Sequence, residues 1–323
     1  MTRVARGLAA ATVLAGLVTG CGANESDTGG CAVREPVRLA IATGNATGVY
    51  HALGGALAEQ LAQGTEGKVR ATAAETVGSP QNIQQLVSGT AQLAFSQSDT
   101  AADAALGKGV FEGNSQPVRA LSRLYLSYAH VIVRADAKID SLADMRGRRV
   151  STGGAQSGTE MIAQRMLRAA GLNPDADIQA QHWDLGRTVD GMREGTLDAM
   201  FFIGGLPTPG VTELLASAHD KVRLIDVTDV LPGLRAMSTS YEGGAIPASV
   251  YATASDTRAV VVPNVLLVRE DMDPDLACVV TRTLFDRKPQ LEQANSAAKG
   301  ILRGIAPDTD PVALHRGAAR VIR

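Results

Sequence analysis

A glycine-rich turn near the middle of the chain, GAQSGTE at residues 154–160, carries the side chains best suited to hold a ligand. Ser157 and Glu160 have the spacing of a capping box, which predicts a helix from Glu160 to Ala170. The glycines let the backbone approach a bound molecule, and a helix N-terminus stabilises an anionic group by about 0.3–2 kcal/mol. Two interpretations are open at this point: a carboxylate-binding loop, or an ordinary turn whose serine only caps the helix.

The same turn lacks the spacing of common catalytic motifs. It has no G-K-[ST] ending, as a P-loop would, and its order G-x-x-S-G differs from the G-x-S-x-G nucleophile elbow. Nothing in the pattern brings His182 to Ser157, and the five histidines are scattered without metal-ligand spacing. We therefore expect a protein that is not an enzyme and that uses no metal and no cofactor.

Two more polar turns lie between predicted strands and helices. Ser79 precedes Pro80 at a predicted helix start, and Thr43–Gly48 (TGNATG) follows an apolar run. Glycines and small polar residues at such positions are suited to the recognition of anions or amides. Each turn alone is more often simple capping, but three of them at strand ends in one chain favour a ligand site.

Aromatic residues make up only 3% of the chain, and several lie close to these turns. We expect Tyr50 to line a cleft as part of an apolar wall, and Phe201 to pack in the core. Asp99 follows the apolar run that ends at Phe95. It could pair with a ligand ammonium group or remain a solvated carboxylate at a helix start, and the sequence favours neither.

From Val37 onward, short apolar runs alternate with helical patterns, as in α/β folds with largely parallel sheets. Residues 82–96 and 188–202 repeat one pattern: a helix, then Gly-Thr, then an apolar strand. This repeat predicts two lobes of similar build, and ligands of open α/β sheets bind beyond the carboxyl ends of the strands. Residues 130–139 and 259–271 are apolar enough to cross between the lobes, which would create a hinge and a cleft.

The N-terminal residues read as a targeting segment rather than as part of the fold. Residues 1–20 combine Arg3 and Arg6 with an apolar stretch, and the small residues before Cys21 resemble the lipobox of bacterial lipoproteins. We expect cleavage and lipidation at Cys21, a flexible tether over 21–35, and an extracytoplasmic protein anchored to the cell membrane. An ordinary secretory signal with an incidental cysteine is the alternative.

Cys31 and Cys278 are the other two cysteines. Outside the cytoplasm they could pair, and closing so long a loop would stabilise the fold by about 5 kcal/mol in the chain-entropy model. The alternative is two unpaired thiols, with Cys278 a small core residue of an apolar helix.

Composition narrows the class of protein further. The chain has 323 residues, of which 45% are hydrophobic and 20% charged, with a formal net charge of −2. This balance excludes general disorder and gives no electrostatic support to nucleic-acid binding. One large domain or two lobes can be built from a chain of this length.

The residues above resemble the TAXI family of TRAP-transporter solute receptors over most of residues 37–320. The most specific stretch is SLADMRGRRVSTGGAQSGTE at 141–160, supported by GTLDAMFFIGGLP at 195–207 and NVLLVREDMDPDL at 264–276. The resemblance implies a two-lobed α/β periplasmic-binding-protein fold of type II, with two crossing strands. Lobe 1 would comprise 36–129 plus 258–323, and lobe 2 would comprise 130–257.

The resemblance also implies a ligand and a partner. The ligand would be a small carboxylate, an amino acid such as glutamate or a dicarboxylate, delivered by a monomeric receptor to the membrane permease of a TRAP transporter. The implied contacts are Thr43, Gly44, Tyr50, Ser79, Asn82, Gln97 and Asp99 from lobe 1, and Ser157, Gly158, Thr159, Phe202 and Gly204 from lobe 2. His51 departs from the family, which often has a second tyrosine there, and this departure concerns the ligand's identity.

Two other functions fit the same sequence. A receptor of an ATP-driven importer for sulfonates or thiamine precursors shares the SLADLKG-like and strand-Gly-Thr features. A ligand-sensing partner of a membrane kinase would need the same cleft.

Overall fold

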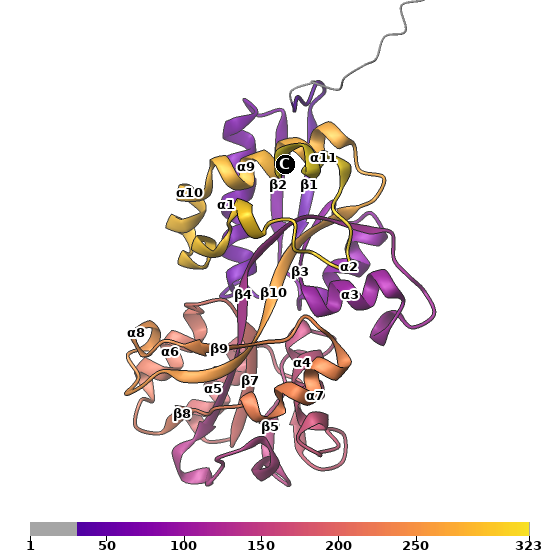
Figure 1. Ribbon diagram of the computed structural model, residues 1–323. Helices are drawn as coiled ribbons and strands as arrows, with labels where there is room; N and C mark the ends of the chain where they lie inside the picture. The colour runs from indigo at the N-terminus through magenta and orange to yellow at the C-terminus, as the bar shows by residue number, and fades with distance from the viewer. Residues whose placement is uncertain (1–30, 323) are drawn as a thin grey trace, which may run out of the picture. The chain divides into compact units, whose positions relative to one another are not determined.

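The computed structural model describes residues 31–322 (Figure 1). The predicted signal peptide at 1–20 and the lipidation site Cys21 lie outside these residues. Of the predicted tether, 31–35 are described, and Cys31 and Val33 pack against the hydrophobic core of lobe 1. Cys31 and Val33, which the sequence analysis placed in the tether, are therefore part of the folded body.

Lobe 1 begins with three parallel strands, β1 (Val37–Ala42), β2 (Val69–Ala74) and β3 (Leu93–Gln97). Helices α1 (Val49–Gly64), α2 (Ser79–Val87) and α3 (Ser98–Leu106) follow them in turn. Apolar side chains of α1, such as Leu57, pack on one face of the sheet, and those of α2 and α3, such as Ile83 and Ala101, pack on the other.

Lobe 2 repeats this plan with β5 (Arg149–Ser151), β6 (Gln179–Gln181) and β7 (Ala199–Gly204), again parallel. Its helices α4 (Gly158–Ala169) and α5 (Leu185–Glu194) pack on opposite faces. The remaining elements are α6 (Pro209–Ser217), β8 (Val222–Leu224), α7 (Leu231–Met237), β9 (Glu242–Ile246) and α8 (Ala248–Tyr251).

Two long antiparallel strands, β4 (Val118–Arg134) and β10 (Thr257–Arg269), run through both lobes (Figure 1). β10 pairs with β3 in lobe 1, and β4 pairs with β7 in lobe 2. The second crossing agrees with the expected 259–271 to within two residues. The first crossing strand was predicted at 130–139, but β4 already starts at Val118. The polar residues Ser122 and Arg123 interrupt its apolar pattern, so its beginning was not recognised.

The sheet order is β2-β1-β3-β10-β4-β7-β5-β6, so each lobe places its first three strands in the same order beside a crossing strand. The repeat found in the sequence corresponds to α2–β3 in lobe 1 and α5–β7 in lobe 2. Residues of β4 up to Tyr125 belong to the core of lobe 1, and those from Ala129 onward belong to lobe 2. The exact lobe boundaries given above stay a prediction.

The C-terminal helices α9 (Pro274–Asp286), α10 (Lys288–Ala294) and α11 (Arg316–Ile322) return to lobe 1. Val280 and Leu284 of α9 pack in its core, as expected. Cys278, only 1% exposed, forms a disulfide with Cys31 and so joins α9 to the start of the described chain. Between residues 31 and 322, no helix is both long and apolar enough to span a membrane.

Candidate functional site

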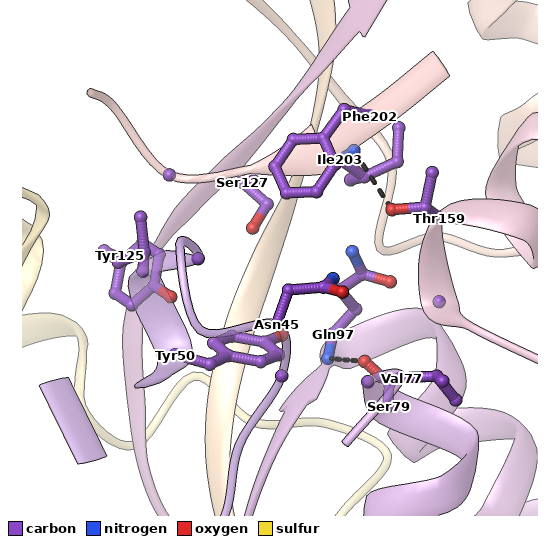
Figure 2. A pocket seen from close by; sticks show the side chains of 17 residues that line it. Asn45, Tyr50, Val77, Ser79, Gln97, Tyr125, Ser127, Thr159, Phe202 and Ile203 are labelled. Atoms are coloured by element: carbon purple, nitrogen blue, oxygen red, sulfur yellow. Dashed lines mark hydrogen bonds between the residues drawn. The ribbon is translucent and has the colours of Figure 1, made fainter. Parts of the chain in front are cut away.

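A pocket lies where the carboxyl ends of strands from both lobes meet (Figure 2). It contains about 440 Å³ of space between protein atoms, a volume that includes the solvent at its open mouth. Its lining residues are Gly44, Asn45, Gly48, Val49, Tyr50, Val77, Gly78, Ser79, Gln97, Tyr125, Ser127, Gly158, Thr159, Phe202, Ile203, Gly204 and Gly205.

Three helices begin at the wall of this pocket. α1 starts at Val49 and α2 at Ser79 in lobe 1, and α4 starts at Gly158 in lobe 2. The first backbone N–H groups of a helix have no partner inside the helix, and they carry its positive dipole end. Neither α1 nor α2 has an acidic residue in its first turn. The pocket is therefore suited to an anionic group.

The two lobes are in close contact at Gly158. A Cβ atom added there would overlap Oε1 of Gln97 and lie 3.0 Å from Oγ of Ser79, both in lobe 1. On the opposite side, a Cβ at Gly78 would lie 3.6 Å from the backbone nitrogen of Gly158. Gly158 is thus required for the lobes to close on each other with this spacing.

Two polar side chains of the wall are buried without a hydrogen-bond partner in the described part of the chain. They are Oε1 of Gln97 and the hydroxyl of Tyr125, and each residue is 3% exposed. The backbone N–H of Gln97 donates to Oγ of Ser79 at 3.0 Å, which fixes the strand end while leaving the side-chain amide extended toward Phe202 (Figure 2). Buried polar groups nearly always have a partner, so these two point to a bound molecule.

Behind them, a neutral network joins the wall to the crossing strands. The hydroxyl of Tyr50 donates to Oδ1 of Asn264 on β10 at 2.5 Å, and Nδ2 of Asn264 donates to Oγ of Ser127 on β4 at 2.9 Å. Burial raises the pKa of Tyr50 and of Tyr125, so both stay protonated and available as hydroxyl donors. The ring of Tyr50 stacks on Phe95 with 5.2 Å between centroids.

The wall of the pocket contains no charged side chain among the residues described. Asp99, expected as a partner for a ligand ammonium group, is fully buried and lies outside the wall. Its carboxylate accepts from Arg165 at 2.8 Å and from the hydroxyl of Tyr241 at 2.6 Å. Burial alone would lower the pKa of Arg165, but the carboxylate of Asp99 raises it, so the guanidinium stays charged.

The Asp99–Arg165 pair joins the two lobes, since Asp99 lies in the first turn of α3 and Arg165 lies on α4. The same guanidinium also bonds Asp103 of α3. We refer to Asp99, Asp103, Arg165 and Tyr241 as the interlobe latch. Across residues 31–322, no three His, Cys, Asp or Glu side chains are placed to hold a metal ion.

Two other expected contacts, Thr43 and Asn82, do not line the pocket but hold together the strands and helix around it. Thr43 is fully buried and donates to the carbonyl of Ala74 at 2.6 Å. Asn82, also fully buried, donates to the carbonyls of Thr43 and Phe95 and so ties α2 to β1 and β3. The expected contacts that do line the pocket are Gly44, Tyr50, Ser79, Gln97, Gly158, Thr159, Phe202 and Gly204.

Ser157 caps α4, as its spacing predicts: its Oγ accepts from the backbone N–H of Glu160 at 3.0 Å. The helix starts at Gly158, two residues before the expected position. Ser157 lines an adjoining pocket on the lobe 2 side, together with Trp183 and Asp184. Asp184 caps α5 there by accepting from the N–H of Arg187 at 2.9 Å.

The main wall residues that the sequence analysis missed are Tyr125 and Ser127 on β4. They are two residues apart, so they point to the same face of the strand. A tyrosine and a serine at alternating positions of a strand-like run were the available signal. It was overlooked because the crossing strand was placed too late in the chain.

Comparisons with known proteins agree with this architecture. The sequence model of the NMT1-like family matches residues 41–323. A solved structure from Bordetella bronchiseptica RB50 is similar with a TM-score of 0.55 at 18% identity, over 86% of this chain and 83% of that one. A binding protein component of an ABC phosphonate transporter from Pseudomonas aeruginosa has a TM-score of 0.54 at 12% identity, over 82% and 79% of the two chains.

A third similar structure is an ancestral arginine-binding protein bound to arginine, with a TM-score of 0.50 at 13% identity, over 83% of this chain and 100% of that one. At such low identities the likeness concerns the fold alone. It confirms the expected two-lobed α/β fold of periplasmic binding proteins, type II.

Proposed function

This chain belongs to the NMT1-like family, and on that premise we propose that it is an extracytoplasmic solute-binding receptor that closes its two lobes on a small carboxylate. The observation that carries the proposal is the interlobe pocket, in which Gln97 and Tyr125 present buried polar atoms without a partner. The helix starts around it supply N–H donors and a positive field to a carboxylate. The proposal assigns no catalysis to the chain.

The finer parts of the proposal rest on the sequence. The lipobox-like residues before Cys21 support a lipid anchor, and the stretch at 141–160 supports delivery to the ion-coupled permease of a TRAP transporter. The receptor of an ATP-driven importer is the second candidate, favoured by the similar fold of the phosphonate-transporter component. A permease gene beside the coding gene would support the TRAP transporter, and an ATPase gene there would support the ATP-driven importer.

Thermal melting of the purified protein against carboxylates, sulfonates and phosphonates tests the proposal. A ligand at a hundred times its dissociation constant adds about 2.7 kcal/mol to the free energy of unfolding, a readily measured shift. A shift with carboxylates supports the proposal, and a shift with phosphonates or sulfonates alone favours the second candidate. If no compound in the panel shifts the melting temperature, the proposal of a carboxylate receptor fails.

Gly158→Ala tests whether the ligand binds between the lobes. Because the added Cβ overlaps Gln97 when the lobes are closed, we expect the dissociation constant to rise about tenfold or more, equivalent to about 1.4 kcal/mol. Gly55→Ala is the matched control, since a Cβ at this exposed position of α1 meets no atom within 4 Å. Equal affinity of both variants, measured by calorimetry, would contradict binding at this interface.

A further inference from the structure

We infer that the ligand is a small monocarboxylic acid that carries a neutral oxygen substituent, a hydroxyl or a keto group, and no ammonium group. This inference rests on the proposed function and narrows it. The argument depends on three features of the pocket: its lack of charged side chains, the helix starts that surround it, and the two unpartnered polar groups in its wall.

The first feature is the distribution of charge. Binding an ammonium group in a closed pocket requires a carboxylate beside it, because a buried charge without a partner is costly. None of the pocket's wall residues supplies one. Asp99, the carboxylate that follows the wall strand β3, is already bonded to Arg165 and Tyr241.

Two other carboxylates, those of Asp184 and Glu160, also form hydrogen bonds within the protein. Asp184, in the adjoining pocket, accepts from the backbone N–H of Arg187 at 2.9 Å. Glu160, in the first turn of α4, accepts from the N–H of Gln156 at 2.5 Å and lies 2.6 Å from Nδ1 of His182. Neither of them, nor Asp99, lines the pocket, so an amino acid's ammonium group would have no carboxylate beside it in the wall.

The second feature is the field of the helices. A helix N-terminus acts as about half a positive charge, and α1 and α2 both begin at the wall with no acidic residue in the first turn. Two such ends together act as about one positive charge, which balances the single negative charge of one carboxylate. The same field repels an ammonium group, and it leaves the second charge of a dicarboxylate without a partner.

The third feature is the pair of neutral groups that lack partners. The amide of Gln97 has both a donor and an acceptor, and the hydroxyl of Tyr125 can also do either. A hydroxyl or keto oxygen beside the carboxylate would satisfy them without adding charge. A site built to bond such an oxygen selects strongly for ligands that carry it.

Calorimetric titration with matched ligand series tests this inference. Each series keeps one carbon skeleton and varies one group: alanine, lactate, pyruvate and propionate; valine and its 2-hydroxy, 2-oxo and unsubstituted acids; glutamate, 2-hydroxyglutarate, 2-oxoglutarate and glutarate. We expect the best ligand to be a hydroxy or oxo monoacid, bound at least tenfold more tightly than the matching amino acid and the unsubstituted acid. The dicarboxylates should bind more weakly than the monoacids.

Tightest binding of an amino acid, or of a dicarboxylate, would overturn the inference while leaving the receptor function intact. Binding of sulfonates or phosphonates alone, or of no compound at all, would overturn both the inference and the carboxylate receptor. These outcomes distinguish a failed specificity from a failed function.

Two variants of one wall residue test the charge argument separately. Gln97→Glu adds a negative charge and Gln97→Met removes the polar atoms, while both keep nearly the same size. We expect the acid to bind to Gln97→Glu at least tenfold more weakly than to Gln97→Met. Equal affinities would contradict the argument from charge, and the ligand series on the unmodified protein decides the question if either variant fails to fold.

Discussion

Two tyrosines of the pocket wall, Tyr50 and Tyr125, lie 6.5 Å apart between ring centroids but bond differently. The hydroxyl of Tyr50 donates to Asn264, a partner within the protein, whereas that of Tyr125 has none in the described chain. Removing a paired buried hydroxyl costs the fold a hydrogen bond, but removing an unpaired one costs the fold nothing. The first hydroxyl therefore serves the fold and the second is free to serve the ligand.

This difference gives a prediction at the level of single residues. Tyr125→Phe should leave the free energy of unfolding of the ligand-free protein unchanged or raise it by about 1 kcal/mol, and weaken ligand binding by about 0.5–1.5 kcal/mol. Tyr50→Phe should lower the free energy of unfolding by about 0.5–1.5 kcal/mol, because Oδ1 of Asn264 loses one of its two donors and keeps Ser127. Urea unfolding and calorimetry measure both quantities. The assignment fails if Tyr125→Phe destabilises the fold and leaves affinity unchanged.

Sequence reasoning identified those pocket residues that belong to a recognisable local motif. Ser79 and Gly158 stand at helix starts that proline, glycine and capping patterns reveal. Such reasoning could not identify the partner of Asp99. The sequence correctly placed Asp99 just after β3, but the residue that it pairs with, Arg165, is 66 residues away and in the other lobe. No local pattern shows that a distant arginine has already engaged a carboxylate.

At the level of elements, His130 connects β4, β7 and α8 behind the pocket wall. Its Nδ1 lies 3.2 Å from the carbonyl of Phe202, and its Nε2 lies 2.9 Å from the hydroxyl of Tyr251. The carbonyl of Phe202 can only accept, so Nδ1 carries the proton of the neutral ring. Nε2 then accepts from the hydroxyl of Tyr251, which itself accepts from the N–H of Thr208 at 3.0 Å. Burial lowers its pKa to about 4.

The depressed pKa of His130 predicts acid sensitivity of lobe 2. The unfolded chain binds this proton near pH 6.5 and the folded one only near pH 4, so stability falls as pH drops through this range. The loss from this histidine approaches about 3 kcal/mol at pH 4. Urea unfolding from pH 7 to 4 should show a smaller decline for His130→Gln. The exposed His219→Gln should follow the unmodified protein; a decline equal in all three would contradict the prediction.

The elements themselves were predictable where hydrophobic periodicity was strong. The helix–Gly-Thr–strand repeat indicated α2–β3 and α5–β7 because both strands are buried along their whole length and begin with apolar residues. The first crossing strand was misplaced because β4 is half polar in sequence: it is stabilised by pairing with β10 and β7, and these contacts are far away in the chain. Tertiary pairing, rather than local propensity, determines where that strand begins.

At the level of the whole molecule, the two lobes are connected by crossing strands and held by the latch. The ladder between β4 and β10 shifts register between Pro263 and Val265, where proline also removes a backbone donor. This irregularity makes the crossing a candidate hinge. The latch joins α3 of lobe 1 to α4 of lobe 2, where Arg165 bonds the buried carboxylates of Asp99 and Asp103. Closure is therefore stabilised in part by the protein itself, before any ligand binds.

Replacing Arg165 tests this account of closure. Arg165→Met leaves Asp99 and Asp103 buried without their cation, a loss of about 3–5 kcal/mol that opening of the lobes relieves by hydrating both carboxylates. We expect a larger radius of gyration by small-angle X-ray scattering in the ligand-free variant, and an apparent dissociation constant about tenfold higher or more, because the closed state is less populated. Saturating ligand should restore the compact form.

Arg168→Met is the control, since Arg168 is exposed on the same helix and, within residues 31–322, its side chain bonds Gln164 at 3.5 Å and no carboxylate. It should scatter and bind as the unmodified protein does. If Arg165→Met instead loses stability with an unchanged radius of gyration, the four latch residues hold the fold of the closed body and do not govern its opening. Expansion that ligand reverses would show that affinity in this receptor is set jointly by the pocket and by an ion pair that never touches the ligand.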